Sequence, residues 1–161
     1  MDKKVATLLN DQIQKEFVSA YIYLDMANYY GEKNLDGFAH WFTKQAEEEM
    51  EHGMKIYNYM HDNGIKVTLK PIAAPSKKYK NASEPLAEAL KHEQYVTSSI
   101  YAIVAAAEKA KDYRTLQFLD WFVAEQAEEE KDAGELIDKM TLFGKTPEGL
   151  YLIDKELASR E

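Results

Sequence analysis

Residues 35–59 read LDGFAHWFTKQAEEEMEHGMKIYNY. The bulky apolar residues of this stretch recur every three or four positions, which is the spacing of one face of an α-helix. Three polar residues, Gln45, Glu49 and His52, interrupt that face in its middle. Glu49 and His52 form an E-x-x-H pattern, so their side chains lie one turn apart on the same face. The stretch therefore predicts a helix that points a carboxylate and an imidazole into a core.

The same interruption recurs in three other stretches of the chain. Each has an apolar helical face with one glutamate near its middle, and these glutamates are Glu16, Glu93 and Glu129. A carboxylate inside a core must be hydrogen-bonded, paired with a cation or bound to a metal. The four faces carry no lysine or arginine. Two divalent cations would therefore balance the four carboxylates best.

Four long helices and a short fifth are predicted along the chain. The long helices are expected at about residues 3–32, 35–63, 83–111 and 112–143, and the short one at about 146–159. Ser83, Asp112 and Thr146 are expected to cap the last three of these helices at their N-termini, because short polar side chains accept hydrogen bonds from free helical N–H groups. Gly64 is expected just past the end of the second helix.

The connections between these helices define the topology. Two of them are short, so the first and second helices form one antiparallel hairpin and the third and fourth form another. Residues 65–82 form a long linker, which contains Pro71 and Pro75 and must cross the length of the bundle. The prediction is an all-α, single-domain chain over residues 1–161, with a four-helix bundle at about 3–143 and one long crossover. The four glutamates fall near mid-length of their helices.

Composition excludes several classes of function. The chain has 161 residues, a formal net charge of −8 and no cysteine. The acidic balance disfavours nucleic acid and anionic membranes as main partners and favours cations. Disulfides, thiolate zinc sites and iron–sulfur clusters need cysteine and are excluded. No signal peptide or membrane-spanning run is recognised, so a cytoplasmic location is expected.

The residue types point to the kind of metal. Oxygen ligands with a single imidazole suit iron or manganese. Glu16, Glu49 and His52 are expected to hold one metal, and Glu49 is placed to bridge to a second metal at Glu93 and Glu129. The alternative is that each carboxylate makes a buried salt bridge or reaches solvent.

These motifs resemble the ferritin family, in which inward Glu and Glu-x-x-His ligands hold two irons inside a helical bundle. The resemblance extends over essentially the whole chain, and it is strongest to the prokaryotic non-haem ferritins. It implies a cytoplasmic shell of 24 subunits that oxidises Fe(II) with O₂ or H₂O₂ and stores the ferric mineral inside. The activity so implied is that of a ferroxidase that lacks haem.

The resemblance also implies roles for single residues. Glu16, Glu49 and His52 match the first iron site, and Glu49, Glu93 and Glu129 match the second, with Gln126 nearby. An additional iron site would use Glu48, Glu125, Glu128 and Glu129. Tyr23 would lie beside the two irons and supply an electron during oxygen reduction.

One departure sorts among related proteins. Bacterioferritins and most di-iron oxygenases carry a second E-x-x-H, whereas residues 125–129 here read EQAEE without a histidine. A haem-containing bacterioferritin is therefore disfavoured. The competing interpretations are a di-iron peroxidase or oxygenase without mineral storage and a purely structural bundle.

Two further expectations concern other parts of the chain. His40, His61 and His92 are expected at the surface or at helix ends, and His92 is expected to point away from the metal site. The last helix has an apolar stripe, which we expect to pack against the same helix of neighbouring subunits; the resemblance to ferritins implies that these helices meet around a four-fold axis. The stripe consists of Leu150, Tyr151, Ile153 and Leu157.

Overall fold

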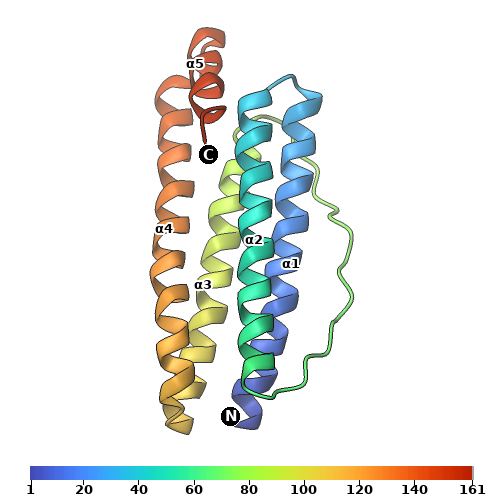
Figure 1. The fold of residues 1–161 in the computed structure, drawn as a ribbon. Helices are drawn as coiled ribbons and strands as arrows, with labels where there is room; N and C mark the ends of the chain where they lie inside the picture. Colours follow the sequence, from blue (N-terminus) through green and yellow to red (C-terminus); the bar gives the residue numbers. More distant parts are fainter. Residues whose placement is uncertain (161) are drawn as a thin grey trace.

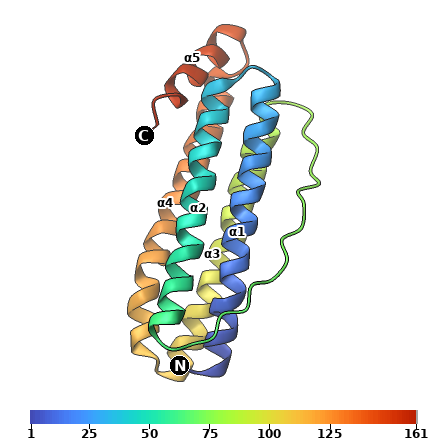
Figure 2. The ribbon, with the colours of Figure 1, turned by 45° about the vertical axis from the view of Figure 1, so that its right-hand side comes forward.

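The computed structural model describes residues 1–160, in which five α-helices are the regular elements (Figure 1). The helices are α1 Lys3–Glu32, α2 Asp36–Asp62, α3 Glu84–Ala110, α4 Tyr113–Phe143 and α5 Pro147–Leu157. The four long helices form a bundle, and the short α5 lies at one end of it (Figures 1 and 2). The prediction of an all-α bundle with a short fifth helix is confirmed.

Local chemistry explains where several helices begin and end. Gly64 has a φ of 69°, a left-handed conformation that glycine adopts without steric cost, and it follows α2. The side chain of Asp112 accepts a hydrogen bond from the Thr115 N–H at 3.1 Å, and Thr146 Oγ1 accepts one from the Gly149 N–H, also at 3.1 Å. The predicted caps of α4 and α5 are therefore confirmed.

The expected Ser83 cap of α3 is wrong. Ser83 precedes α3, but its side chain makes no capping hydrogen bond. The turn before α3 is fixed by other side chains instead. Asn81 Oδ1 accepts from the Ser83 N–H at 3.0 Å, and Glu84 Oε2 accepts from the Lys80 N–H at 2.7 Å. Serine is a residue type that suits a cap, but here the side chains of Asn81 and Glu84 accept the backbone hydrogen bonds of the turn.

The long crossover between α2 and α3 runs beside α1 over much of the bundle's length (Figures 1 and 2). The Asn10 amide holds Thr68 through both of its backbone groups, at 2.7 and 3.0 Å. Near the other end of the crossover, the Tyr30 hydroxyl donates to the Ala82 carbonyl at 2.6 Å. The crossover returns the chain to the end where α5 lies, so α3 begins there and runs parallel to α2 (Figure 1). The short connection between α3 and α4 makes these two helices antiparallel, and the predicted topology is confirmed.

The hydrophobic core consists of two clusters stacked along the bundle. The cluster nearer α5 includes Tyr23, Ala46, Ala89 and Leu136, one from each long helix. The cluster at the opposite end includes residues from the same four helices, namely Ile13, Ile56, Val96 and Phe122. On each long helix a buried glutamate falls between the two clusters in sequence. The clusters therefore enclose a polar layer near mid-height.

The helix α5 packs on its own bundle, which corrects the expectation that its apolar stripe meets only neighbouring subunits. Ile153 and Leu157 are buried in the nearer apolar cluster. Asp154 Oδ1 accepts hydrogen bonds from the N–H groups of Gly37 and Phe38, at 2.8 and 3.1 Å. Leu35, which precedes α2, has no side-chain oxygen, so α5 supplies the cap for α2.

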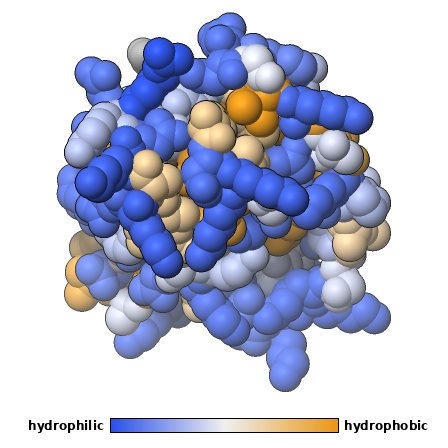
Figure 3. Space-filling view, turned by 90° about the horizontal axis from the view of Figure 1, so that it is seen from below, coloured by the Kyte–Doolittle hydropathy of each residue, from blue (hydrophilic) through white to orange (hydrophobic). Residues whose placement is uncertain are grey.

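The surface is mostly polar. The end of the bundle opposite α5 presents mainly hydrophilic side chains with small apolar patches between them (Figure 3). Within residues 1–160, no helix has an apolar stretch long enough to cross a membrane.

Candidate metal centre

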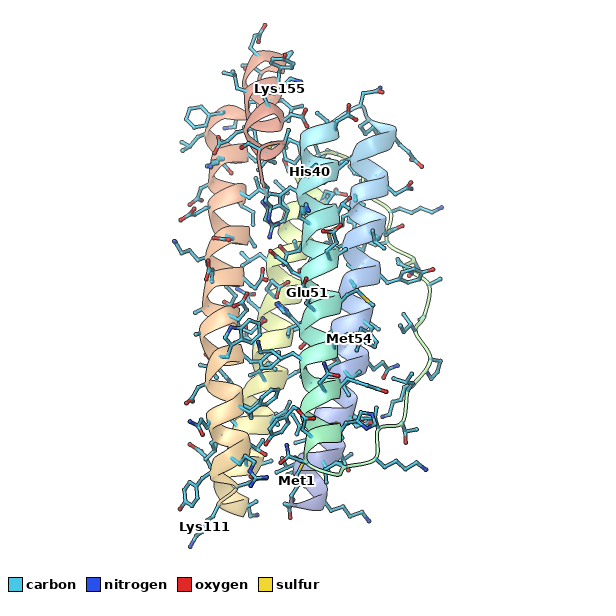
Figure 4. The ribbon with its side chains drawn as sticks, in the orientation of Figure 1. Met1, His40, Glu51, Met54, Lys111 and Lys155 are labelled. Atoms are coloured by element: carbon cyan, nitrogen blue, oxygen red, sulfur yellow. The ribbon has the colours of Figure 1, made fainter. Side chains whose placement is uncertain are left out.

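The polar layer gathers side chains from all four long helices. Glu16 comes from α1, Glu49 and His52 from α2, Glu93 from α3 and Glu129 from α4, and each is at most 7% exposed. Figure 4 shows Glu51, the neighbour of His52, near the middle of α2. The prediction that the inward glutamates meet at one height agrees with this arrangement.

Two sets of potential metal ligands share the His52 imidazole. Ligand atoms of Glu16, Glu49 and His52 lie within 4.8 Å of one another, and so do those of His52, Glu125 and Glu129. His52 Nδ1 is 3.6 Å from Glu49 Oε2, whereas Nε2 is 3.7 Å from Glu125 Oε1. The structure therefore places the imidazole between an inner and an outer group of carboxylates.

Neutral side chains hold the four buried carboxylates. Each glutamate accepts a hydrogen bond from an amide: Gln12 to Glu16 at 2.8 Å, Gln45 to Glu49 at 3.5 Å and to Glu129 at 2.7 Å, and Gln126 to Glu93 at 3.0 Å. These donors fix the carboxylates without neutralising their charge. Among the residues that the structure describes, Glu16 Oε2 is buried without a hydrogen-bond partner. An oxygen in this state is costly unless a cation or proton binds it.

The surroundings of these acids favour their protonated forms. Burial raises the pKa of Glu16 well above its usual value, and the nearby Glu49 raises it further. Burial also raises the pKa of Glu49, to which Glu93 and Glu129 add. Burial, followed by the charge of Glu93, raises the pKa of Glu129 to about 8. Divalent cations would offset these shifts, because nearby positive charge stabilises the ionised carboxylates.

Tyr23 lies at the edge of this layer. Its hydroxyl donates a hydrogen bond to Glu93 Oε1. Burial and then the charge of Glu93 raise the pKa of Tyr23 well above its usual value, so the side chain is a neutral phenol at physiological pH. The structure thus places Tyr23 beside a carboxylate of the centre.

His92 is not the surface residue that the sequence suggested. It packs between α1 and α3, with Nε2 2.7 Å from Ser19 Oγ and its ring edge-on to Tyr23 at 5.9 Å. Burial lowers the pKa of His92 to about 4, so the ring is neutral. It is in neither of the two ligand sets.

The residues expected to form the additional iron site are only partly gathered. Glu125 is partly buried and lies with His52 and Glu129. Glu48 instead forms an ion pair with Arg160, with Oε2 2.5 Å from Nη2. Glu128 is exposed. Of these four carboxylates, the structure therefore brings only Glu125 and Glu129 together with His52.

Three supporting residues were missed as functional by sequence reasoning. Gln12 and Gln45 each precede a buried glutamate by four positions, and this i, i+4 spacing could have identified them. Arg160 carries no comparable signal, because its contacts to α2 span more than 110 residues.

Comparisons with known proteins agree with this geometry. The family model described as "Ferritin-like domain" matches residues 6–143. A bacterial non-heme ferritin from Staphylococcus haemolyticus is 40% identical over 160 residues, which cover 99% of this chain and 96% of the relative. One from Staphylococcus aureus strain USA300 is 38% identical with the same coverage.

Solved structures give the same result. A ferritin from the archaeon Archaeoglobus fulgidus, described as a novel open pore ferritin, matches with a TM-score of 0.97 and 36% identity. The match covers 100% of this chain and 98% of the archaeal one. With the fold, the buried carboxylates and the relatives all in agreement, the chain belongs to the ferritin family of iron-storage proteins, among the non-haem ferritins.

Proposed function

We propose that each subunit is a ferroxidase that binds two Fe(II) ions in the polar layer and oxidises them with O₂. The observation that carries this proposal is the set of buried, uncompensated carboxylates around His52, which includes an oxygen of Glu16 without a partner. Anionic oxygen ligands stabilise Fe(III) more than Fe(II), because the higher charge gains more from them. A site of this composition therefore favours iron oxidation.

The geometry supports a role for each residue of this inner site, which we define as Glu16, Glu49, His52, Glu93 and Glu129. Glu16, Glu49 and His52 would hold the first iron, and Glu93 and Glu129 the second, with Glu49 between the two. Gln126 lies next to the second position through its hydrogen bond to Glu93. Two Fe(II) ions give up one electron each, so together they reduce O₂ by two electrons. Tyr23 would supply a further electron, and its phenolic proton would pass to the Glu93 carboxylate to which it is hydrogen-bonded.

An outer site is proposed at Glu48, Glu125, Glu128 and Glu129. The contact of Glu125 with His52 supports it, because this places an outer carboxylate next to the inner ligands. Iron that leaves the inner site would pass through the outer site toward solvent, where the exposed Glu128 lies. A third iron per subunit is the consequence.

Storage requires an enclosed volume, and a single bundle does not provide one. We propose a shell of 24 subunits in the cytoplasm that keeps the ferric mineral inside and uses O₂ or H₂O₂ as oxidant. The naming of the bacterial relatives as non-heme ferritins supports this proposal.

Substitution of inner ligands tests the assignment. In stopped-flow measurements, His52→Ala and Glu49→Ala should each slow the fast phase of Fe(II) oxidation by more than about tenfold, the smallest loss expected even for a residue that only supports a ligand. Glu51→Ala is the matched control, because Glu51 lies between them in sequence but is exposed. Oxidation at the parent rate in both ligand variants would show that the inner site is not the ferroxidase centre.

A further inference from the structure

The segment after α5 returns to α2 and places a cation against the metal centre. Arg160 Nη2 donates to Glu48 Oε2 at 2.5 Å, and Nη1 donates to Gln45 Oε1 at 3.1 Å. Nη1 also donates to the Trp41 carbonyl at 3.1 Å, and the guanidinium lies 4.5 Å from the centre of the Trp41 ring. One side chain thus contacts three consecutive turns of α2.

Gln45 links this guanidinium to the inner carboxylates. Its carbonyl oxygen accepts from Arg160, so its NH₂ group must face the opposite direction. That group donates to Glu129 Oε2 at 2.7 Å and is 3.5 Å from Glu49 Oε1. Gln45 is 1% exposed, so little space is available for other partners. Arg160 therefore holds the carbonyl end of this amide, while Glu49 and Glu129 accept from its NH₂ end.

Glu48 links the same guanidinium to the outer site. An arginine is positively charged at every physiological pH and has no lone pair with which to ligate a metal. Glu48 Oε2 lies 2.5 Å from Arg160 Nη2, so this oxygen is already paired with a cation. An iron arriving at Glu48 would have to displace the guanidinium or bind beside it against charge repulsion.

We infer that Arg160 is a positioning residue of the iron centre, which pairs with the outer carboxylate Glu48 and helps to hold Gln45 against the inner carboxylates. It acts as an internal competitor for the outer metal, so iron at Glu48 must displace the guanidinium or bind beside it against charge repulsion. This inference rests on the proposed function, because it assumes metal ions at both sites.

A purely structural role for Arg160 is the alternative. The segment is held independently of the guanidinium, since His40 Nε2 donates to the Arg160 carbonyl at 2.7 Å. Figure 4 shows His40 on the part of α2 close to the end of the chain that follows α5. Removal of the guanidinium should therefore leave the backbone in place and change mainly Glu48 and Gln45.

Two conservative variants separate the charge from the orientation of Gln45. Arg160→Lys keeps the charge near Glu48 but loses the planar fork that reaches both side chains. Arg160→Gln loses the charge and keeps hydrogen-bonding groups. Lys139→Ala is the matched control, because it removes a different cation, one that pairs α4 with Glu156 of α5 and lies ten residues from Glu129.

Zinc is the probe, because it does not change oxidation state and its anomalous scattering locates it in crystals. Crystals of the assembled protein soaked at graded Zn(II) concentrations should show outer-site occupancy at about fivefold lower concentration in Arg160→Gln than in the parent. The inner site should fill as in the parent. Arg160→Lys should stay within about twofold of the parent at the outer site, while its metal-free crystals show Gln45 turned from its parent orientation.

The outcomes are distinct. Equal outer-site occupancy in the parent and Arg160→Gln would overturn the inference, as would a parallel loss of zinc from both sites, which indicates a structural role only. An inner site that binds no zinc in the parent would contradict the proposed function, and the inference with it.

Discussion

Glu129 is an acid whose surroundings favour the bound proton. Burial and then the charge of Glu93 raise its pKa from 4.5 to about 8, and the pKa values of Glu16 and Glu49 are raised for the same kind of reason. Without bound metal, the folded protein therefore keeps protons on these carboxylates at pH values where the unfolded chain has already released them. Their contribution to stability is greatest at low pH and is lost as pH rises toward 8.

This sign gives a prediction for the metal-free protein. Between pH 5 and pH 8 its thermal unfolding temperature should fall, because folded-state carboxylates lose protons in a buried site. Glu129→Gln should flatten this slope, since a neutral amide of the same shape does not titrate. The effect of Glu129 alone should amount to roughly 3 kcal/mol. Calorimetry in the presence of a chelator measures it, and a parent slope that the substitution leaves unchanged would contradict the assignment.

Single residues differ in how well sequence predicts them. Glu16, Glu49, His52, Glu93 and Glu129 could be predicted to point inward, because helix periodicity alone places them on apolar faces. The contact of Gln45 with Glu129 joins different helices, and periodicity within one helix carries no information about it. His92 was misjudged for the same reason, because the space that it fills between α1 and α3 exists only after packing.

At the scale of elements, α5 is joined to α2 by a close backbone approach. A Cβ atom on Gly37 would lie 1.6 Å from the Asp154 carbonyl oxygen, so only glycine permits this packing. The same turn of α5 brings the Asp154 side chain to the free N–H groups of Gly37 and Phe38. The start of α2 and the position of α5 therefore depend on each other.

Substitution at this junction should release α5. Gly37→Ala should force the α5 backbone away, and Asp154→Ala should leave the first N–H groups of α2 uncapped at a cost of about 1–2 kcal/mol. Hydrogen exchange should then be faster in α5 and in the first turn of α2. Gly134→Ala is the control, because no atom lies within 4 Å of its added Cβ, and it should leave exchange there unchanged. Unchanged protection in both junction variants would show that α5 is held by other contacts.

The elements themselves were predictable, and their ends lie within two residues of the expected positions. Strong caps at Asp112 and Thr146 act through neighbours in sequence, which is why they could be found. The cap of α2 by Asp154 could not be predicted, because Asp154 lies 117 positions after Gly37, whose N–H it accepts from. For the same reason the apolar stripe of α5 was assigned to neighbouring subunits, although half of it fills the subunit's own core.

For the whole molecule, the corrected packing of α5 changes which residues are free for assembly. Tyr151 and Leu152 are 59% and 67% exposed, and Leu142 and Phe143 at the end of α4 are 71% and 59% exposed. Large apolar side chains exposed on these two neighbouring elements favour contact with other subunits. The shell interface should therefore use this corner rather than Ile153.

Assembly measurements distinguish the two faces of α5. Leu152→Asp should weaken the shell and leave the bundle helical, because Leu152 is exposed in the subunit. Ile153→Ala should lower the unfolding temperature by removing buried apolar volume, at a cost of about 2–4 kcal/mol, and should affect assembly less. Light scattering coupled to size-exclusion chromatography, together with circular dichroism, measures both. An intact shell of Leu152→Asp at low protein concentration would contradict this interface.

Each bundle is proposed to hold a complete di-iron oxidation site. Stopped-flow oxidation of the metal-depleted protein with increasing amounts of Fe(II) under excess O₂ tests this. Oxidation should be fast up to two to three Fe(II) per subunit, because the inner site has two positions and the outer site one, and slower beyond that amount. Fe(II) oxidation no faster than in protein-free buffer, or without a break at that stoichiometry, would contradict the claim.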